Sequence, residues 1–141
     1  MLDAHSAGSW AGSIDALPTT ALATNALGMA IDSRRPPVGA IIHSDQGVRF
    51  GSWAFTDRAK ASGLVPSMGS VGDCFDNSMI EAFWSRMQVE LLDRQSWRTR
   101  IELANAILEY LGIWHNRRRR HSALGRVSPL EFENRRKIVV A

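Results

Sequence analysis

The sequence predicts an α/β fold, and two observations carry that prediction. The first is a short apolar run, Val38–His43, which has the length of a strand and lies between prolines and the polar turn Ser44–Gly47. Buried parallel strands have this composition, although periodicity alone leaves a buried helical segment as the alternative. The second is the set of segments around this run in which apolar residues recur every three or four positions. Strands that alternate with helices in this way indicate a sheet covered by helices.

The N-terminal half is predicted to place this strand between two helices. The first helix starts at Pro18 and ends before Pro36, because proline disfavours helical geometry in the residue that precedes it. The second follows Ser52, which suits an N-cap, and ends at Gly63, which suits the left-handed residue after a helix. Residues 1–17 give only a weak strand signal, so they remain either a strand or irregular chain.

The C-terminal half is predicted to be helical after an edge strand at Leu64–Val65 and a loop over Pro66–Asp73, which is rich in Gly, Pro and Ser. The long central helix should reach Asn116. The helices begin at a cap on Asp76 or Asn77, at the capping box Thr99–Glu102 and at the capping box Ser128–Glu131. Four tryptophans at helical spacing are predicted to be core, with base stacking as the alternative for Trp84; they are Trp53, Trp84, Trp97 and Trp114.

Composition narrows the class of protein. The single cysteine, Cys74, excludes an internal disulfide and a multi-cysteine zinc site, which favours a reducing cytoplasm. The N-terminus has neither the basic nor the apolar region of a signal peptide, and no segment approaches the ~18 apolar residues of a membrane helix. We therefore expect a cytoplasmic protein without a membrane partner.

Positive charge is concentrated near the C-terminus. Residues 114–137 contain eight Lys or Arg and two Glu, whereas residues 1–70 contain five basic and five acidic side chains. A concentrated basic patch is typical of nucleic-acid contact, with a solvated helix end as the alternative. The candidate DNA-binding residues are Arg49, Arg86, Arg117, Arg118, Arg119, Arg120, His121 and Arg126.

Two carboxylates are the candidate catalytic and metal-binding residues. Asp45 follows the predicted strand, and Glu81 lies in the first turn of a predicted helix. If they converge, their oxygen atoms suit Mg²⁺ or Mn²⁺, and two such ions can hold the attacking and leaving oxygens of a phosphodiester transfer. Either residue alone has a simpler explanation, because Asp45 can cap a turn and Glu81 can interact with the helix dipole.

The motifs together resemble the catalytic core of bacterial insertion-sequence transposases, the DDE enzymes related to retroviral integrases. The resemblance rests on His43–Gly47, the Gly51–Phe55 segment, the Pro66–Asn77 segment, Glu81–Trp84 and His115–Gly125 with Ser128–Phe132. It implies an RNase H-like mixed sheet with flanking helices and a helical C-terminal extension. It also implies that Asp45 is the second aspartate of the family, that Glu81 is its glutamate, and that both bind Mg²⁺.

The sequence also departs from the family pattern. The first aspartate of the family is expected upstream of Met1, and Asp3 matches a structural position rather than that ligand. We expect a truncated core over residues 1–133 with a basic tail over 134–141. Because two ligands of three should hold metal weakly, we expect this chain to be inactive in strand transfer by itself. The alternatives are a non-catalytic DNA-binding or dimerisation remnant and, more remotely, a nuclease that uses two carboxylates. Expected partners are double-stranded DNA of the element ends and target, a second copy or a full-length transposase in the nucleoid.

Overall fold

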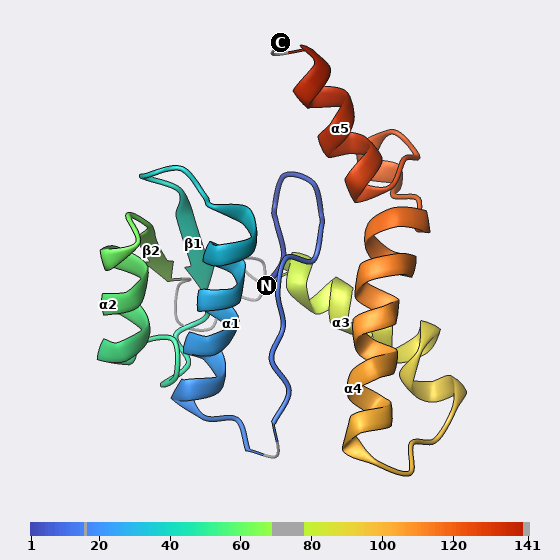
Figure 1. Cartoon of the computed structure of the whole chain (residues 1–141), viewed down its shortest axis with the longest axis horizontal. Helices are drawn as coiled ribbons and strands as arrows, with labels where there is room; N and C mark the ends of the chain where they lie inside the picture. Colours follow the sequence, from blue (N-terminus) through green and yellow to red (C-terminus); the bar gives the residue numbers. More distant parts are fainter. Residues whose placement is uncertain (16, 69–77, 140–141) are drawn as a thin grey trace. The chain divides into compact units, whose positions relative to one another are not determined.

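The computed structural model describes residues 1–15, 17–68 and 78–139 (Figure 1). The chain forms two compact units, one of Met1 with Trp10–Ala82 and one of Leu2–Ser9 with Phe83–Ala141. The expected boundary at residue 133 lies inside the last helix, α5 (Pro129–Val139). The cap predicted at Asp76 or Asn77 and most of the predicted loop lie outside the described residues.

The first unit contains a parallel strand pair and the helix that connects its strands. The strands β1 (Ile41–Ser44) and β2 (Val65–Met68) pair in register from Ile41 with Val65 to Ser44 with Met68. Between them runs α2 (Trp53–Ala61), which starts at the predicted N-cap Ser52. The mixed α/β class is confirmed, and Pro66–Met68 is strand rather than the predicted loop.

The helix α1 (Thr20–Arg34) precedes the strand pair and closes the core of this unit. It ends before the two prolines, as the sequence predicts, with Arg35 as a C-cap in a left-handed conformation that the sequence did not predict. The buried cluster joins α1 to α2 and the start of β2, with Ile42 packed against it; its members are Leu27, Phe55, Ala59 and Leu64. Burial of these side chains is the main force that holds the helices on the strand pair.

The strand pair is buried on one face only, which corrects the prediction of a fully buried strand. Ile42 packs on the core, whereas Ile41 is 72% exposed. Alternate residues of a strand point to opposite faces, and in β1 exposed and partly buried residues alternate accordingly, whereas in β2 the two middle residues are partly buried. The apolar run predicted the strand correctly but did not predict how many layers would cover it.

The second unit is helical. It contains part of α3 (Ser78–Glu90), the short η2 (Leu92–Arg94), α4 (Arg100–Glu109), the π-helix η3 (Tyr110–Arg118), the short η4 (Ser122–Leu124) and α5. The predicted capping box at Ser128 forms, because Ser128 Oγ accepts from Glu131 N–H at 3.2 Å and Glu131 Oε2 accepts from Ser128 N–H at 2.9 Å. At Thr99 the N-cap bond forms, with Thr99 Oγ1 accepting from Glu102 N–H at 3.1 Å, but the Glu102 carboxylate accepts from Arg98 N–H rather than from Thr99 N–H. The helix predicted to reach Asn116 is an α-helix, α4, that continues directly as the π-helix η3.

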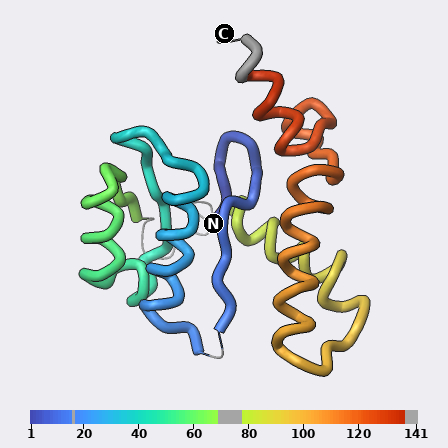
Figure 2. Tube along the Cα trace, viewed as in Figure 1, coloured from blue at the N-terminus to red at the C-terminus, as the bar shows by residue number. Residues whose placement is uncertain are grey.

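The N-terminal loop belongs to this helical unit (Figure 2). Leu2 and Ser9 form an antiparallel bridge. The Asn116 side chain accepts from Ser9 N–H and donates to Ser9 C=O, both at 2.8 Å. Ser6 is buried, and its hydroxyl oxygen lies 2.7 Å from Asp3 Oδ2 and 2.8 Å from Glu133 Oε1, so its single proton can bond to either carboxylate. Residues 2–9 thus neither fray nor form a strand of the β1–β2 sheet.

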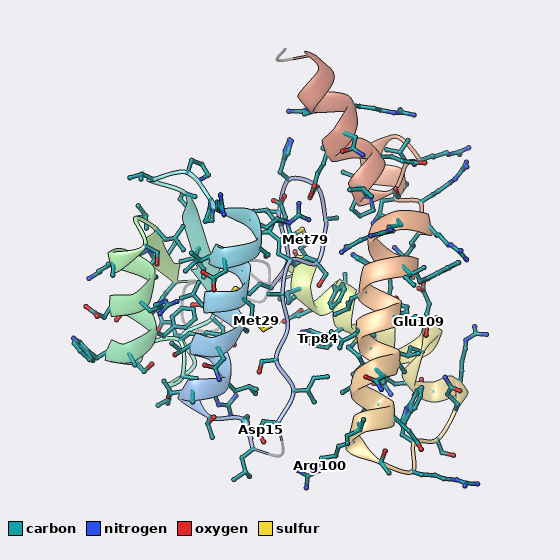
Figure 3. All side chains as sticks on the ribbon, viewed as in Figure 1. Asp15, Met29, Met79, Trp84, Arg100 and Glu109 are labelled. Atoms are coloured by element: carbon teal, nitrogen blue, oxygen red, sulfur yellow. The ribbon has the colours of Figure 1, made fainter. Side chains whose placement is uncertain are left out.

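Three tryptophans predicted to be core are largely exposed. Trp53 is 79% exposed, Trp84 55% and Trp114 46%. Figure 3 labels Trp84 among the side chains. Helical spacing identifies the apolar side of a helix, but it does not show that another element covers that side. Among the described residues, no helix combines the length and apolar composition that crossing a membrane requires.

Candidate functional site

Asp45 lies immediately after β1, as predicted, and its side chain is exposed. Its Oδ1 accepts a hydrogen bond from Gly47 N–H at 3.0 Å, which is the turn-capping interaction that the sequence left open. A Cβ at Gly47 would lie 2.8 Å from the same oxygen, so a larger residue there would displace the carboxylate. The turn therefore holds one oxygen of Asp45 at the carboxyl end of the strand.

Glu81 lies in the first turn of α3, also as predicted, and is exposed. It belongs to the same compact unit as Asp45. Within the described part of the chain, no three His, Cys, Asp or Glu residues gather as a metal site. Two carboxylates are an all-oxygen donor set that suits a hard divalent ion, but they provide few of the ligands such an ion takes.

A second polar cluster, which the sequence did not predict, is centred on Glu90 at the end of α3. Its Oε2 accepts from the Tyr110 hydroxyl at 2.8 Å and from Trp114 Nε1 at 3.0 Å. Arg119 Nε lies 3.1 Å from Oε1 and completes an ion pair. We call these four residues the Glu90 cluster. The three partners of Glu90 lie 20 to 29 residues after it in the sequence, so no local motif reveals the cluster.

The π-helix brings the three donors to one carboxylate. Arg119 N–H donates to Trp114 C=O at 2.7 Å, a bond that spans five residues rather than four. This wider turn lets Tyr110, Trp114 and Arg119, separated by four and five residues, reach the same partner. A π-helical segment that aligns side chains in this way is a common feature of functional sites.

The hydrogen bonds of the cluster set its protonation states. Burial raises the pKa of Glu90, but the bonds from Trp114 and Tyr110 and the charge of Arg119 outweigh it and hold the pKa below its usual value. Burial and the bond to Glu90 raise the pKa of Tyr110 well above its ordinary value. Near neutral pH, Glu90 is therefore an anion and Tyr110 a donor.

Two histidines lie beside this cluster. His115 is buried, its Nε2 lies 2.8 Å from Ala7 C=O, and its ring meets that of His121 with centroids 5.1 Å apart. Burial and then the charge of Arg119 lower the pKa of His121 to about 4, and burial also lowers the pKa of His115. His121 is therefore uncharged at neutral pH and offers a phosphate no positive charge there.

These histidines predict a loss of stability in mild acid. In the folded chain the pKa of His121 is about 4, whereas the unfolded chain binds its proton near pH 6.5. The unfolded state then holds more protons between these values, so the melting temperature should fall as the pH drops from about 7 to about 5. The melting temperature of His121→Gln should depend less on pH than that of the wild type. The control His43→Gln, at an exposed histidine, should keep the wild-type pH dependence. Equal slopes for wild type and His121→Gln would contradict this assignment.

The predicted arginine run separates into two kinds of side chain. Arg117, Arg118 and Arg120 are exposed at the end of η3, as are Arg49, Arg86 and Arg126 in their own segments. Arg119 instead is half-buried and pairs with Glu90. The structure thus directs three members of the run to the surface and one, Arg119, toward Glu90, which a run of identical residues could not show.

The class of domain follows from residues 62–129, which match the family described as the integrase core domain. The match includes Glu81 and the arginine run and begins after Asp45. This segment, which has Glu81 at the start of α3, is thus similar to an integrase core domain.

The relatives confirm the resemblance to insertion-sequence transposases. The chain is 40% identical over 117 residues to the uncharacterized 31 kDa protein of insertion element IS600 from Shigella sonnei, covering 83% of this chain and 43% of that protein. It is 39% identical to the transposase of element IS629 from Shigella sonnei, covering 81% and 38% of the two chains. The transposase InsF of element IS3A from Escherichia coli strain K12 is 34% identical, with coverage of 83% and 41%. The chain is thus a relative of insertion-sequence transposases and spans about two fifths of their length.

Proposed function

We propose that the chain acts in DNA transposition, with an RNase H-like first unit that supplies metal-binding carboxylates and a second unit that binds duplex DNA. The observation that carries this proposal is the similarity to named transposases over more than four fifths of the chain. The parallel β1–α2–β2 arrangement, with Asp45 at the carboxyl end of β1, supports the fold assignment. Ligand sites in open α/β sheets lie at that end of the strands.

Duplex DNA is the proposed ligand of the exposed arginines. Arg117, Arg118 and Arg120 carry adjacent positive charges at one helix end, and phosphates relieve their mutual repulsion. Arg49, Arg86 and Arg126 are further contacts on other segments. Arg119 acts indirectly, because its pairing with Glu90 fixes the backbone from which its neighbours project. His121 contributes hydrogen bonds rather than charge.

Asp45 and Glu81 are the proposed ligands of Mg²⁺ or Mn²⁺. Bound there, the ion would supply Lewis-acid polarisation of a phosphodiester oxygen for cleavage and strand transfer. The Gly47 N–H orients one oxygen of Asp45, and the first turn of α3 presents Glu81 where the helix dipole favours its charge. With two carboxylates as ligands, binding should be weak and cleavage by this chain alone slight.

A second candidate function is DNA binding or dimerisation without catalysis, which would modulate a full-length transposase. The exposed arginines favour it, as does the lack of a three-residue metal cluster in residues 1–15, 17–68 and 78–139. Nicking of an element-end duplex that requires Mg²⁺ and is lost in Asp45→Asn would support the enzyme. A salt-sensitive complex that forms without Mg²⁺, with no nicking, would support the second function.

Metal binding tests the carboxylate pair directly. Electron paramagnetic resonance of Mn²⁺ titrated with the full chain should show one weak bound population. Asp45→Asn and Glu81→Gln should each remove it, because each takes away one of two charged ligands. Asp57→Asn, at an exposed aspartate of α2, is the matched control and should leave it unchanged. Retention of bound Mn²⁺ in either single variant would show that the two carboxylates do not share an ion.

A further inference from the structure

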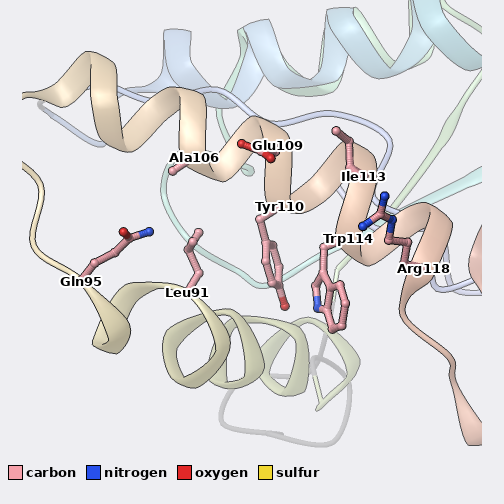
Figure 4. Close-up of a pocket in the computed structure, with 8 residues that line it drawn as sticks. All are labelled: Leu91, Gln95, Ala106, Glu109, Tyr110, Ile113, Trp114 and Arg118. Carbon is pink, nitrogen blue, oxygen red and sulfur yellow. The ribbon is translucent and has the colours of Figure 1, made fainter.

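A surface hollow lies in the second unit between the end of α3 and the α4–η3 helix (Figure 4). Its volume is about 320 Å³, and a second hollow of about 290 Å³ shares Tyr110 and Trp114 with it. Both rings point from η3 toward α3 in Figure 4. Leu91 and Ile113 add apolar surface to the larger hollow. The two rings and these two side chains make much of the lining of the larger hollow apolar.

Trp114 is exposed but held in one orientation. Its Nε1 donates to Glu90 at 3.0 Å, and Tyr110 and Arg119 fix the same carboxylate. Yet 46% of the residue is accessible to solvent. An aromatic ring that is already immobilised loses little conformational entropy when a ligand stacks on it. Trp114 therefore has the properties of a preformed stacking surface.

Charged and polar groups surround this apolar lining. Arg94 lines the smaller hollow, and its Nε donates to Val89 C=O at 3.1 Å, which orients its side chain. Arg118 lines the larger hollow and belongs to the exposed arginine run. Gln95 and Glu109 are the other polar residues of the larger hollow. An aromatic surface shared by two hollows, each with a guanidinium group in its lining, matches a nucleotide, whose flat base and charged phosphate need both features.

We propose that the hollow beside Trp114 binds one unpaired base of DNA, stacked on the indole, while Arg94 and Arg118 contact the flanking phosphates. Gln95 and Glu109 can accept or donate hydrogen bonds at the base edge. This site rests on the proposed DNA-binding function and shares Arg118 with the duplex-binding arginines, but stacking on Trp114 is separate from their phosphate contacts. It assigns a role to a tryptophan that core packing does not use.

The test compares three DNA probes with the full chain: a blunt duplex, the duplex with a single-stranded 3′ extension, and the duplex with an abasic extension. The abasic probe keeps the phosphates and removes the bases, so it isolates stacking. The wild-type chain should bind the base-bearing extension about tenfold more tightly than the abasic one, as expected for one base–aromatic stack. In the same complex, 2-aminopurine in the extension should lose fluorescence, a readout that requires no variant.

Variants then locate the site. Trp114→Leu should abolish the preference for bases, measured as the ratio of the affinities for the base-bearing and abasic extensions. The ratio is used because Trp114 also donates to Glu90, so its loss changes both affinities together. Trp114→Phe should retain much of the preference. Trp53→Leu, at another exposed tryptophan, is the control and should behave as wild type. Equal wild-type affinity for both extensions, or a full preference in Trp114→Leu, would overturn the base site alone. Absence of binding to every probe would overturn the proposed function together with it.

Discussion

Replacement of Glu90 by alanine is expected to destabilise the second unit by about 2–3 kcal/mol. The variant leaves the Arg119 guanidinium, whose side chain is 14% exposed, without its anion and removes the acceptor of Tyr110 and Trp114. Breaking a buried pair costs about 3–5 kcal/mol, and we expect less here because Glu90 is 27% exposed and water screens part of the charge. Urea unfolding followed by circular dichroism measures the change.

Glu109→Ala is the matched control, since this exposed glutamate lies at the end of α4 and outside the Glu90 cluster. Its unfolding free energy should change by less than about 0.5 kcal/mol. Because the pKa of Glu90 is lower in the folded chain, its contribution is present above about pH 4.5 and should disappear as the pH falls through the folded value. A Glu90→Ala variant as stable as wild type would show that the cluster contributes no net stability.

Simultaneous replacement of Arg117, Arg118 and Arg120 by glutamine is expected to weaken duplex DNA binding by about 10²–10³-fold near 0.1 M salt. Each lost phosphate contact should also reduce the slope of log K against log salt by about 0.9. Fluorescence anisotropy over a salt series measures both quantities. The three arginines are exposed, so the variant should keep the wild-type melting temperature.

A variant with the same loss of charge elsewhere separates local contact from net charge. Arg58, Arg98 and Arg100 are exposed and lie outside the arginine run, so their joint replacement by glutamine should reduce affinity far less. If both triple variants weaken binding equally, the arginine run is not a specific interface, and overall charge accounts for the affinity.

The features that the sequence predicted are those encoded by neighbouring residues. The N-caps at Ser52 and Thr99 and the capping box at Ser128 form because side chain and backbone partner are three residues apart. The left-handed Gly63 after α2 and the position of Asp45 after β1 follow from equally short segments.

The features that it did not predict depend on distant partners. Glu90 meets Tyr110, Trp114 and Arg119 through a π-helix that spacing rules for α-helices do not include. Trp53 appeared to be core because an apolar pattern cannot show which side of a helix remains uncovered. The proposed pairing of Asp45 with Glu81 is likewise a question of tertiary distance, and it stays a prediction for the Mn²⁺ experiment.

The loop over residues 2–9 has a practical consequence for dissection of the molecule. Its backbone supplies Ala7 C=O to His115 and Ser9 to Asn116, more than a hundred positions later in the chain. Expression of residues 83–141 as an excised piece would remove those partners and leave the side chains of His115 and Asn116 without these hydrogen bonds. Subcloning of the arginine-bearing half should therefore retain the opening segment, joined by a linker, if it is to fold as it does in the intact polypeptide.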